Sequence, residues 1–273
     1  MDSKATKCLI YCAIGFVLVV FLFPVVWVAL ISFKNPVDAF SIPPKWFFTP
    51  TLENHIFIWV EKRFLQYLKN SLLVSLCTPI ISISVSSMAA YAFSRWRNRI
   101  SRFSLFFILT FRMVPVILII LPLYVIVQKV GMQDNIFTLM IIYAALNIPF
   151  TLWLLRGFFI DIPLALDESA MIDGCTRFGA FWRVVLPSAS PGLIAASIFS
   201  FGLAWNEYFV ALCLTGIRTK LLTVAAAEYR GELIQYWSYS AAAAVGIVLP
   251  AVIFMMVVQK YFARGLTFGA VKG

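Results

Sequence analysis

The side chains of this chain that could do chemistry are concentrated in residues 161–187, which read DIPLALDESAMIDGCTRFGAFWRVVLP. A polar segment this long, placed between two runs apolar enough to cross a bilayer, must fold at the membrane surface. We expect Asp161 to cap a first helix that ends at Gly174, and Thr176 to cap a second helix that leads to Pro187. Such an element either docks a soluble partner or seals the protein's own spans, and physics alone does not choose between these roles.

Residues suited to catalysis are scarce elsewhere in the chain. The sequence contains one histidine, His55, and five cysteines that lack the CxxC spacing typical of metal sites. It has no GxxxxGK[ST] phosphate-binding loop and no paired acids in a soluble cleft. We therefore expect a chain that is not an enzyme and that binds no metal or cofactor itself.

The composition indicates a membrane protein. Hydrophobic residues make up 62% of the 273 positions and charged residues only 12%, about half the share typical of soluble domains. The net charge of +10 is not gathered on a soluble basic face, which excludes nucleic-acid binding. Apolar runs of about 20 residues or more predict an all-α fold with six spans in one domain, 1–273. The spans are expected at about 9–31, 70–93, 104–128, 136–156, 188–213 and 240–262.

The basic residues in short turns predict the orientation of these spans. Four arginines, at positions 95, 97, 99 and 102, crowd the turn between spans two and three, whereas Lys129 alone follows span three. Basic turns stay in the cytoplasm. The turn between spans two and three, both termini and residues 161–187 are therefore expected on the cytoplasmic side. Outside, the loop 34–69 is expected to end in a capped amphipathic helix near 52–68.

Several polar residues lie within or at the edges of the spans, where they are costly and thus candidates for function. Arg112 in span three could form a structural or gating pair or touch a solute, and we favour the pair. At the outer end of span five, a cluster could bind sugar hydroxyls or form an interfacial aromatic girdle. Asn147 beside Pro149, and Tyr124 beside Pro122, indicate broken or kinked spans. The cluster in span five comprises Trp205, Asn206, Glu207 and Tyr208.

The segment 161–187 resembles the EAA motif of ABC importer permeases. The matching residues are Glu168-Ser169-Ala170, Asp173-Gly174 and Leu186-Pro187, with Ser169 in place of the usual first alanine. The surroundings resemble the carbohydrate importer branch, whose type is the smaller permease of the maltose system. The supporting motifs are Leu155 to Phe159, Trp205-Asn206-Glu207 and the C-terminal Gly265 to Gly273, so the similarity covers essentially the whole chain.

This resemblance implies a mechanism and a set of partners. The loop would form a cytoplasmic coupling helix seated in a groove of an ATPase. Six residues would carry this coupling: Glu168, Ser169, Ala170, Asp173, Gly174 and Pro187. The implied complex contains a second permease, expected to be a different chain, two ATPase copies that hold ATP and Mg²⁺, and an extracytoplasmic solute-binding protein. It would lie among the lipids of a bacterial or archaeal cytoplasmic membrane. The alternatives are an ion-gradient-driven secondary carrier, which would want an acid within the membrane, and a non-transporting scaffold.

Overall fold

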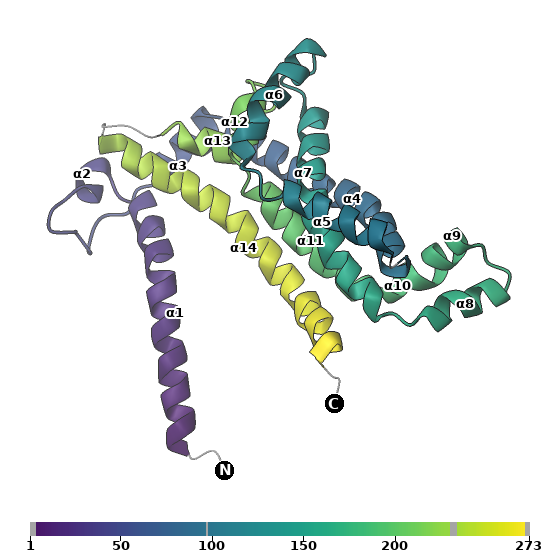
Figure 1. The fold of residues 1–273 in the computed structure, drawn as a ribbon. Coiled ribbons are helices and arrows are strands. Elements are labelled where there is room, and N and C mark those ends of the chain that lie inside the picture. Colours follow the sequence, from purple (N-terminus) through teal and green to yellow (C-terminus); the bar gives the residue numbers. More distant parts are fainter. Residues whose placement is uncertain (1–3, 97, 230–233, 271–273) are drawn as a thin grey trace. The chain divides into compact units, whose positions relative to one another are not determined.

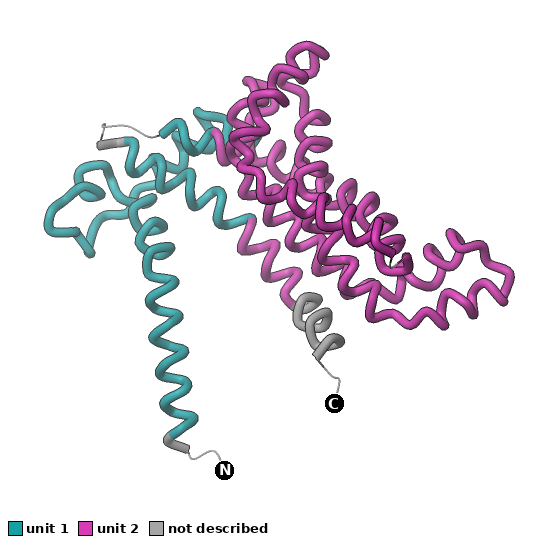
Figure 2. Tube along the Cα trace, viewed as in Figure 1, with its two compact units in different colours: residues 1–66, 225–250 teal, residues 67–224, 251–273 magenta. Residues whose placement is uncertain are grey.

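The computed structural model describes the backbone of residues 4–96, 98–229 and 234–270, and the side chains of 6–96, 98–229 and 236–259. Within these ranges every regular element of secondary structure is a helix, and loops and turns connect them (Figure 1). The chain forms two compact units, 1–66 with 225–250 and 67–224 with 251–273 (Figure 2). The single domain over 1–273 stays a prediction. Arg97, Arg230, Glu232 and the 265–273 motif lie outside the residues whose side chains are described.

Helices that could cross a membrane account for most of the chain. Four single helices are long and apolar enough, and two bent pairs bring the number to six if each pair is one span. The single helices are α1 (Lys4–Ser32), α4 (Phe64–Arg95), α7 (Ile136–Asp161) and α14 (Ile234–Ala270). The prediction of an all-helical, multi-pass membrane protein is therefore confirmed.

The first compact unit contains α1, the loop that follows it and the start of α14. The loop holds two short helices, α2 (Pro36–Ala39) and α3 (Glu53–Ile56), and a π-helical turn, η1 (Phe57–Glu61). The expected helix over 52–68 is wrong as one element. Arg63 adopts a positive φ of 54°, which ends the first helical stretch before α4 begins at Phe64.

Span three is divided into two helices rather than being one. Its parts are α5 (Arg99–Phe111) and α6 (Val116–Lys129), which meet at an angle of 88°. Pro115 precedes α6 with an extended ψ of 130°, and the residue before a proline disfavours the helical conformation. Span three is thus broken, as expected, but ahead of Pro115. The two prolines expected to break or kink spans three and four, Pro122 and Pro149, lie inside α6 and α7 without ending either helix.

The second compact unit is built around α7 and α11 (Ser190–Trp205), which pack along each other. At one end α6 packs on α12 (Phe209–Leu214), and residues 215–221 lead to α13 (Leu222–Ala227). At the opposite end of the unit lie α8 (Leu164–Ile172), α9 (Arg177–Ala180), η2 (Phe181–Val185) and α10 (Leu186–Ser188) (Figure 1). The predicted surface element thus lies at the end of this unit opposite α6, α12 and the 215–221 loop (Figure 1).

Asp134 ties the turn before α7 to the loop after α12. Its carboxylate accepts hydrogen bonds from the backbone N–H groups of Gly216, Arg218 and Thr219 and from the Thr219 hydroxyl, at 2.6–3.2 Å. Burial raises the pKa of this carboxyl, but the hydrogen bonds from Thr219, Gly216 and Arg218 outweigh that effect and hold the pKa below its ordinary value. Asp134 is therefore the anchor of the 215–220 loop.

We expect Asp134→Ala to loosen this loop at a cost of about 1–3 kcal/mol, because several donors lose their acceptor. Trypsin should then cleave after Arg218 or Lys220 faster than in the wild type.

The stabilisation by Asp134 also depends on pH. Because the pKa of its carboxyl is depressed in the folded state, the stabilisation is present above the unfolded value near 3.9 and is lost as pH falls through the folded pKa. Glu61→Gln, at an exposed acid, is the control, and equal cleavage rates in Asp134→Ala and wild type would contradict the anchor.

Candidate functional site

The surface element between spans four and five has the bent two-helix form expected from its sequence. Gly174 adopts a φ of +87°, a left-handed conformation that ends α8 at little cost only for glycine. Thr176 caps α9 by accepting a hydrogen bond from the Gly179 N–H at 3.1 Å. The prediction for Asp161 is wrong: it is the last residue of α7, and only Ile162 and Pro163 separate it from α8.

The structure places the six predicted coupling residues on two sides of this element. Ala170 is buried at 5% exposure, so its small side chain lets α8 lie close to the neighbouring helices. The others are exposed: Glu168, Ser169, Asp173, Gly174 and Pro187. Beside them, large apolar side chains also face outward, among them Ile172 (86% exposed), Phe178 (63%) and Trp182 (47%). Exposed apolar groups beside acids are typical of a protein-binding surface.

Sequence reasoning missed the residue that fixes α8 in place, Asp167. Its carboxylate pairs with the Arg95 guanidinium at the end of α4 at 2.7 Å, and accepts a hydrogen bond from the Tyr91 hydroxyl at 2.5 Å. Arg95 also donates to the backbone carbonyls of Phe159 and Ile162, at 3.0 and 3.2 Å. The side chains of the pair are only 11% and 7% exposed. In the sequence, the sign of this role was that Asp167 is a second acid directly before Glu168.

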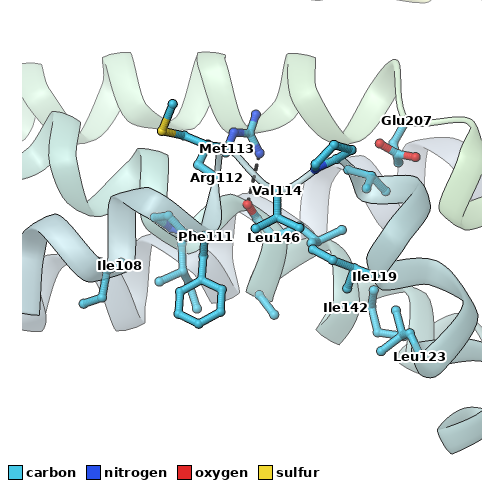
Figure 3. A pocket seen from close by; sticks show the side chains of 15 residues that line it. Ile108, Phe111, Arg112, Met113, Val114, Ile119, Leu123, Ile142, Leu146 and Glu207 are labelled. Atoms are coloured by element: carbon cyan, nitrogen blue, oxygen red, sulfur yellow. Dashed lines mark hydrogen bonds between the residues drawn. The ribbon is translucent and has the colours of Figure 1, made fainter.

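A cavity of about 670 Å³ opens at the break in span three. Arg112 caps the end of α5 there and donates to the Leu146 carbonyl of α7 at 3.1 Å. Figure 3 shows this bond, with Glu207 at a separate point on the wall of the same cavity. Most of the remaining lining is apolar, from Ile108 and Phe111 to Leu123 and Ile142. The cavity thus presents one cation and one anion in an apolar setting.

The other predicted substrate-path residues divide between this region and the core. Asn147 is buried and shares a second, 50 Å³ cavity with Arg112 and Glu207. Asn206 lines a third cavity of about 530 Å³ with Glu207, while its amide donates to the Gly202 carbonyl of its own helix at 2.8 Å. Trp205 stacks on Phe201 and is buried, and Tyr208 packs against the core. Arg112, Asn147, Asn206 and Glu207 therefore line cavities, whereas Trp205 is buried and Tyr208 is half-buried against the core.

Glu207 also has a local structural role. Its carboxylate accepts a hydrogen bond from the Val210 backbone N–H at 3.0 Å, at the start of α12. This bond satisfies a donor that the first turn of a helix leaves unpaired. Within the described residues, no group of three or more His, Cys, Asp or Glu side chains could hold a metal ion.

The fold and this site define a multi-pass membrane protein with a bent, polar two-helix element between two of its spans. The family model of the binding-protein-dependent transport system inner membrane component matches residues 82–268. The chain belongs to this family of transport permeases.

Relatives match over nearly the whole chain. The trehalose/maltose transport system permease of Thermococcus litoralis is 33% identical, covering 93% of each protein. The diacetylchitobiose uptake system permease of Streptomyces coelicolor is 33% identical, covering 92% of each. The sulfoquinovosyl glycerol transport system permease of Agrobacterium fabrum is also 33% identical, covering 98% of this chain and 94% of its own length. The chain is therefore a transport subunit, which argues against the scaffold and the ion-driven carrier.

A solved structure supports the fold. A chain of a bacterial ABC transporter that imports the acidic polysaccharide alginate superposes with a TM-score of 0.77 at 21% identity, covering 96% of this chain and 98% of that one. At this level of identity the likeness concerns the fold alone.

Proposed function

We propose that this chain is a permease subunit of an ATP-driven importer for a carbohydrate or sugar-like solute. The observation that carries the proposal is that relatives from three different genera, each matching over more than nine-tenths of the chain, are named as permeases for trehalose and maltose, diacetylchitobiose and sulfoquinovosyl glycerol. The family description supports a soluble binding protein as the source of the solute.

The element 161–187 is proposed to dock on a cytoplasmic ATPase, of which the complex holds two copies. Glu168 and Asp173 offer acids to basic partner residues, and Ile172 and Phe178 offer apolar area around them. ATP and Mg²⁺ belong to those partner chains. A second permease, expected to be a different chain, would complete the path through a bacterial or archaeal cytoplasmic membrane, with both termini of this chain inside.

The solute path is proposed to include the 670 Å³ cavity at the break in span three. Glu207 would accept hydrogen bonds from solute hydroxyls with the carboxylate oxygen that Val210 does not occupy. Arg112 keeps further N–H groups beyond the one bound to Leu146, so it can donate to the solute or hold α7 in position.

We expect Glu207→Gln to raise the solute concentration that gives half-maximal transport by about tenfold, because a charge-assisted hydrogen bond becomes a neutral one. The amide oxygen can still cap α12, so the folded protein should accumulate normally. Transport should be measured in proteoliposomes, with Glu61→Gln as the control. An unchanged transport affinity would remove Glu207 from the path.

The complex itself provides the test of the proposed function. Purification of the intact assembly, identification of its subunits and a screen of sugars for stimulation of ATP hydrolysis would address it directly. We expect a P-loop ATPase to co-purify and at least one sugar to stimulate it. Absence of that partner, together with uptake driven by a proton or sodium gradient, would overturn the proposal.

A further inference from the structure

Three backbone segments meet around a single guanidinium at the base of the surface element. Arg95 is the last residue of α4, Phe159 and Ile162 lie at the end of α7, and Asp167 lies in the first turn of α8. These residues are 64 to 72 positions apart in the sequence from Arg95. They form what we call the Arg95 joint.

The charges of the joint match the ends of the helices that they touch. The last carbonyls of α7 have no helical partners and carry the negative end of the helix dipole, so a cation that donates to two of them is favoured. The first turn of α8 carries the positive end of its dipole, which favours the Asp167 carboxylate. Arg95 therefore links the end of one helix to the start of the next.

The joint is enclosed rather than a surface ion pair. Arg95 and Asp167 have side chains only 11% and 7% exposed, and the Arg95 guanidinium lies over the Tyr91 ring at 5.5 Å. Arg95, Asp167 and Tyr91 line a cavity of about 500 Å³ together with Glu168, Met171 and Phe178 of the surface element. The desolvation cost of burying an ion pair often cancels its electrostatic gain, so an apolar pair of similar volume could stabilise the fold as well.

We propose that the Arg95 joint, through its Arg95–Asp167 pair, transmits displacement of the surface element to α4 and α7 together. Arg95 and Asp167 are thus positioning residues for coupling. Only Ile162 and Pro163 connect α7 to α8, so covalent linkage moves α7. By contrast, α4 has no covalent link to α8 and is held to the surface element by the Arg95–Asp167 pair, together with the packing of Tyr91 on Phe181. The inference rests on the proposed importer function.

The test compares three variants in the complete reconstituted complex: Arg95→Met, Asp167→Leu and the double variant. Each single change leaves a buried polar partner uncompensated and should lower the melting temperature. The double variant replaces the pair by apolar side chains and so leaves neither charge of the pair uncompensated. Because the Phe159 and Ile162 carbonyls still lose their Arg95 donor, we expect the double variant to melt above both single variants and below the wild type.

The ratio of solute molecules transported to ATP hydrolysed distinguishes positioning from stability. Coupling between sites commonly corresponds to a factor of about 5 to 150, so this ratio should fall at least about fivefold in the double variant. Arg102→Met removes an exposed arginine from α5 and should keep both the ratio and the melting temperature.

Two other outcomes would overturn the inference in distinguishable ways. A double variant that is stable and fully coupled would show that the pair only stabilises the fold, and would leave the importer function intact. A wild-type complex in which no solute stimulates ATP hydrolysis would remove the importer function, and the joint with it.

Discussion

Gly174→Pro is expected to reduce solute-dependent transport severely while the protein still reaches the membrane. Gly174 has a φ of +87°, which the ring of proline, fixed near −65°, does not permit. Its N–H also donates to the Met171 carbonyl at 3.1 Å, and proline has no N–H. The bend would therefore re-form in another shape, and Glu168 would no longer face its partner in register.

We expect transport to fall by more than about tenfold, since the strain exceeds the 1–3 kcal/mol of an ordinary unfavourable backbone conformation. Uptake and ATP hydrolysis should be measured together in proteoliposomes. Gly174→Asn is the matched control because asparagine tolerates the left-handed region and should keep most of the activity. Glu168→Lys, which reverses an exposed charge, should uncouple hydrolysis from transport in the same way. Full transport by both Gly174→Pro and Glu168→Lys would refute the coupling role.

Phe181→Ala is expected to destabilise the protein by about 3–5 kcal/mol, the range for removing a buried aromatic side chain. Phe181 is 2% exposed, and its ring lies 5.0 Å from that of Tyr91 and 6.3 Å from that of Phe159. It is the apolar contact that seats the second half of the surface element on α4 and α7. Thermal unfolding in detergent, followed by intrinsic fluorescence, would measure the loss.

Phe178→Ala provides the matched comparison for Phe181→Ala. Phe178 lies three positions earlier and is 63% exposed, so its removal should leave the melting temperature nearly unchanged. Because it belongs to the proposed docking surface, the same change should weaken association with the ATPase. If both variants lost equal stability, the division between a buried and a docking side of this element would be wrong.

The ends of the surface element were predictable because they depend on local chemistry. Gly174 and Thr176 act within a few residues of themselves, so their types alone indicate the bend and the cap. Asp161 was misassigned because the preceding helix continues through it before the chain turns at Pro163. Extension of a helix by neighbouring packing is not visible in the sequence.

Long-range pairing explains the larger omissions. Arg95 looked like one of several bases that set topology, and nothing in the sequence indicated that Asp167, 72 residues later, would be its partner. Similarly, Pro115 broke span three, while Pro122 and Pro149 were accommodated within helices. Whether a proline breaks a membrane helix depends on whether neighbouring groups satisfy the backbone carbonyl that it leaves unpaired, and the sequence does not show those neighbours.

The bend between α10 and α11 would let a small rotation of the surface element produce a larger displacement at the far end of α11. The helices on either side of Ala189 meet at 76°, and Ala189 is buried at 2% exposure. At 1.5 Å per residue, the 16 residues of α11 form an arm about 24 Å long. If both arms turn as one rigid elbow, each degree of rotation shifts the far end of α11 by about 0.4 Å. A turn of roughly four degrees would therefore move Asn206 and Glu207 by about the rise of one helical residue. A rotation too small to disturb the packing around Ala189 would therefore still move the residues that line the cavities.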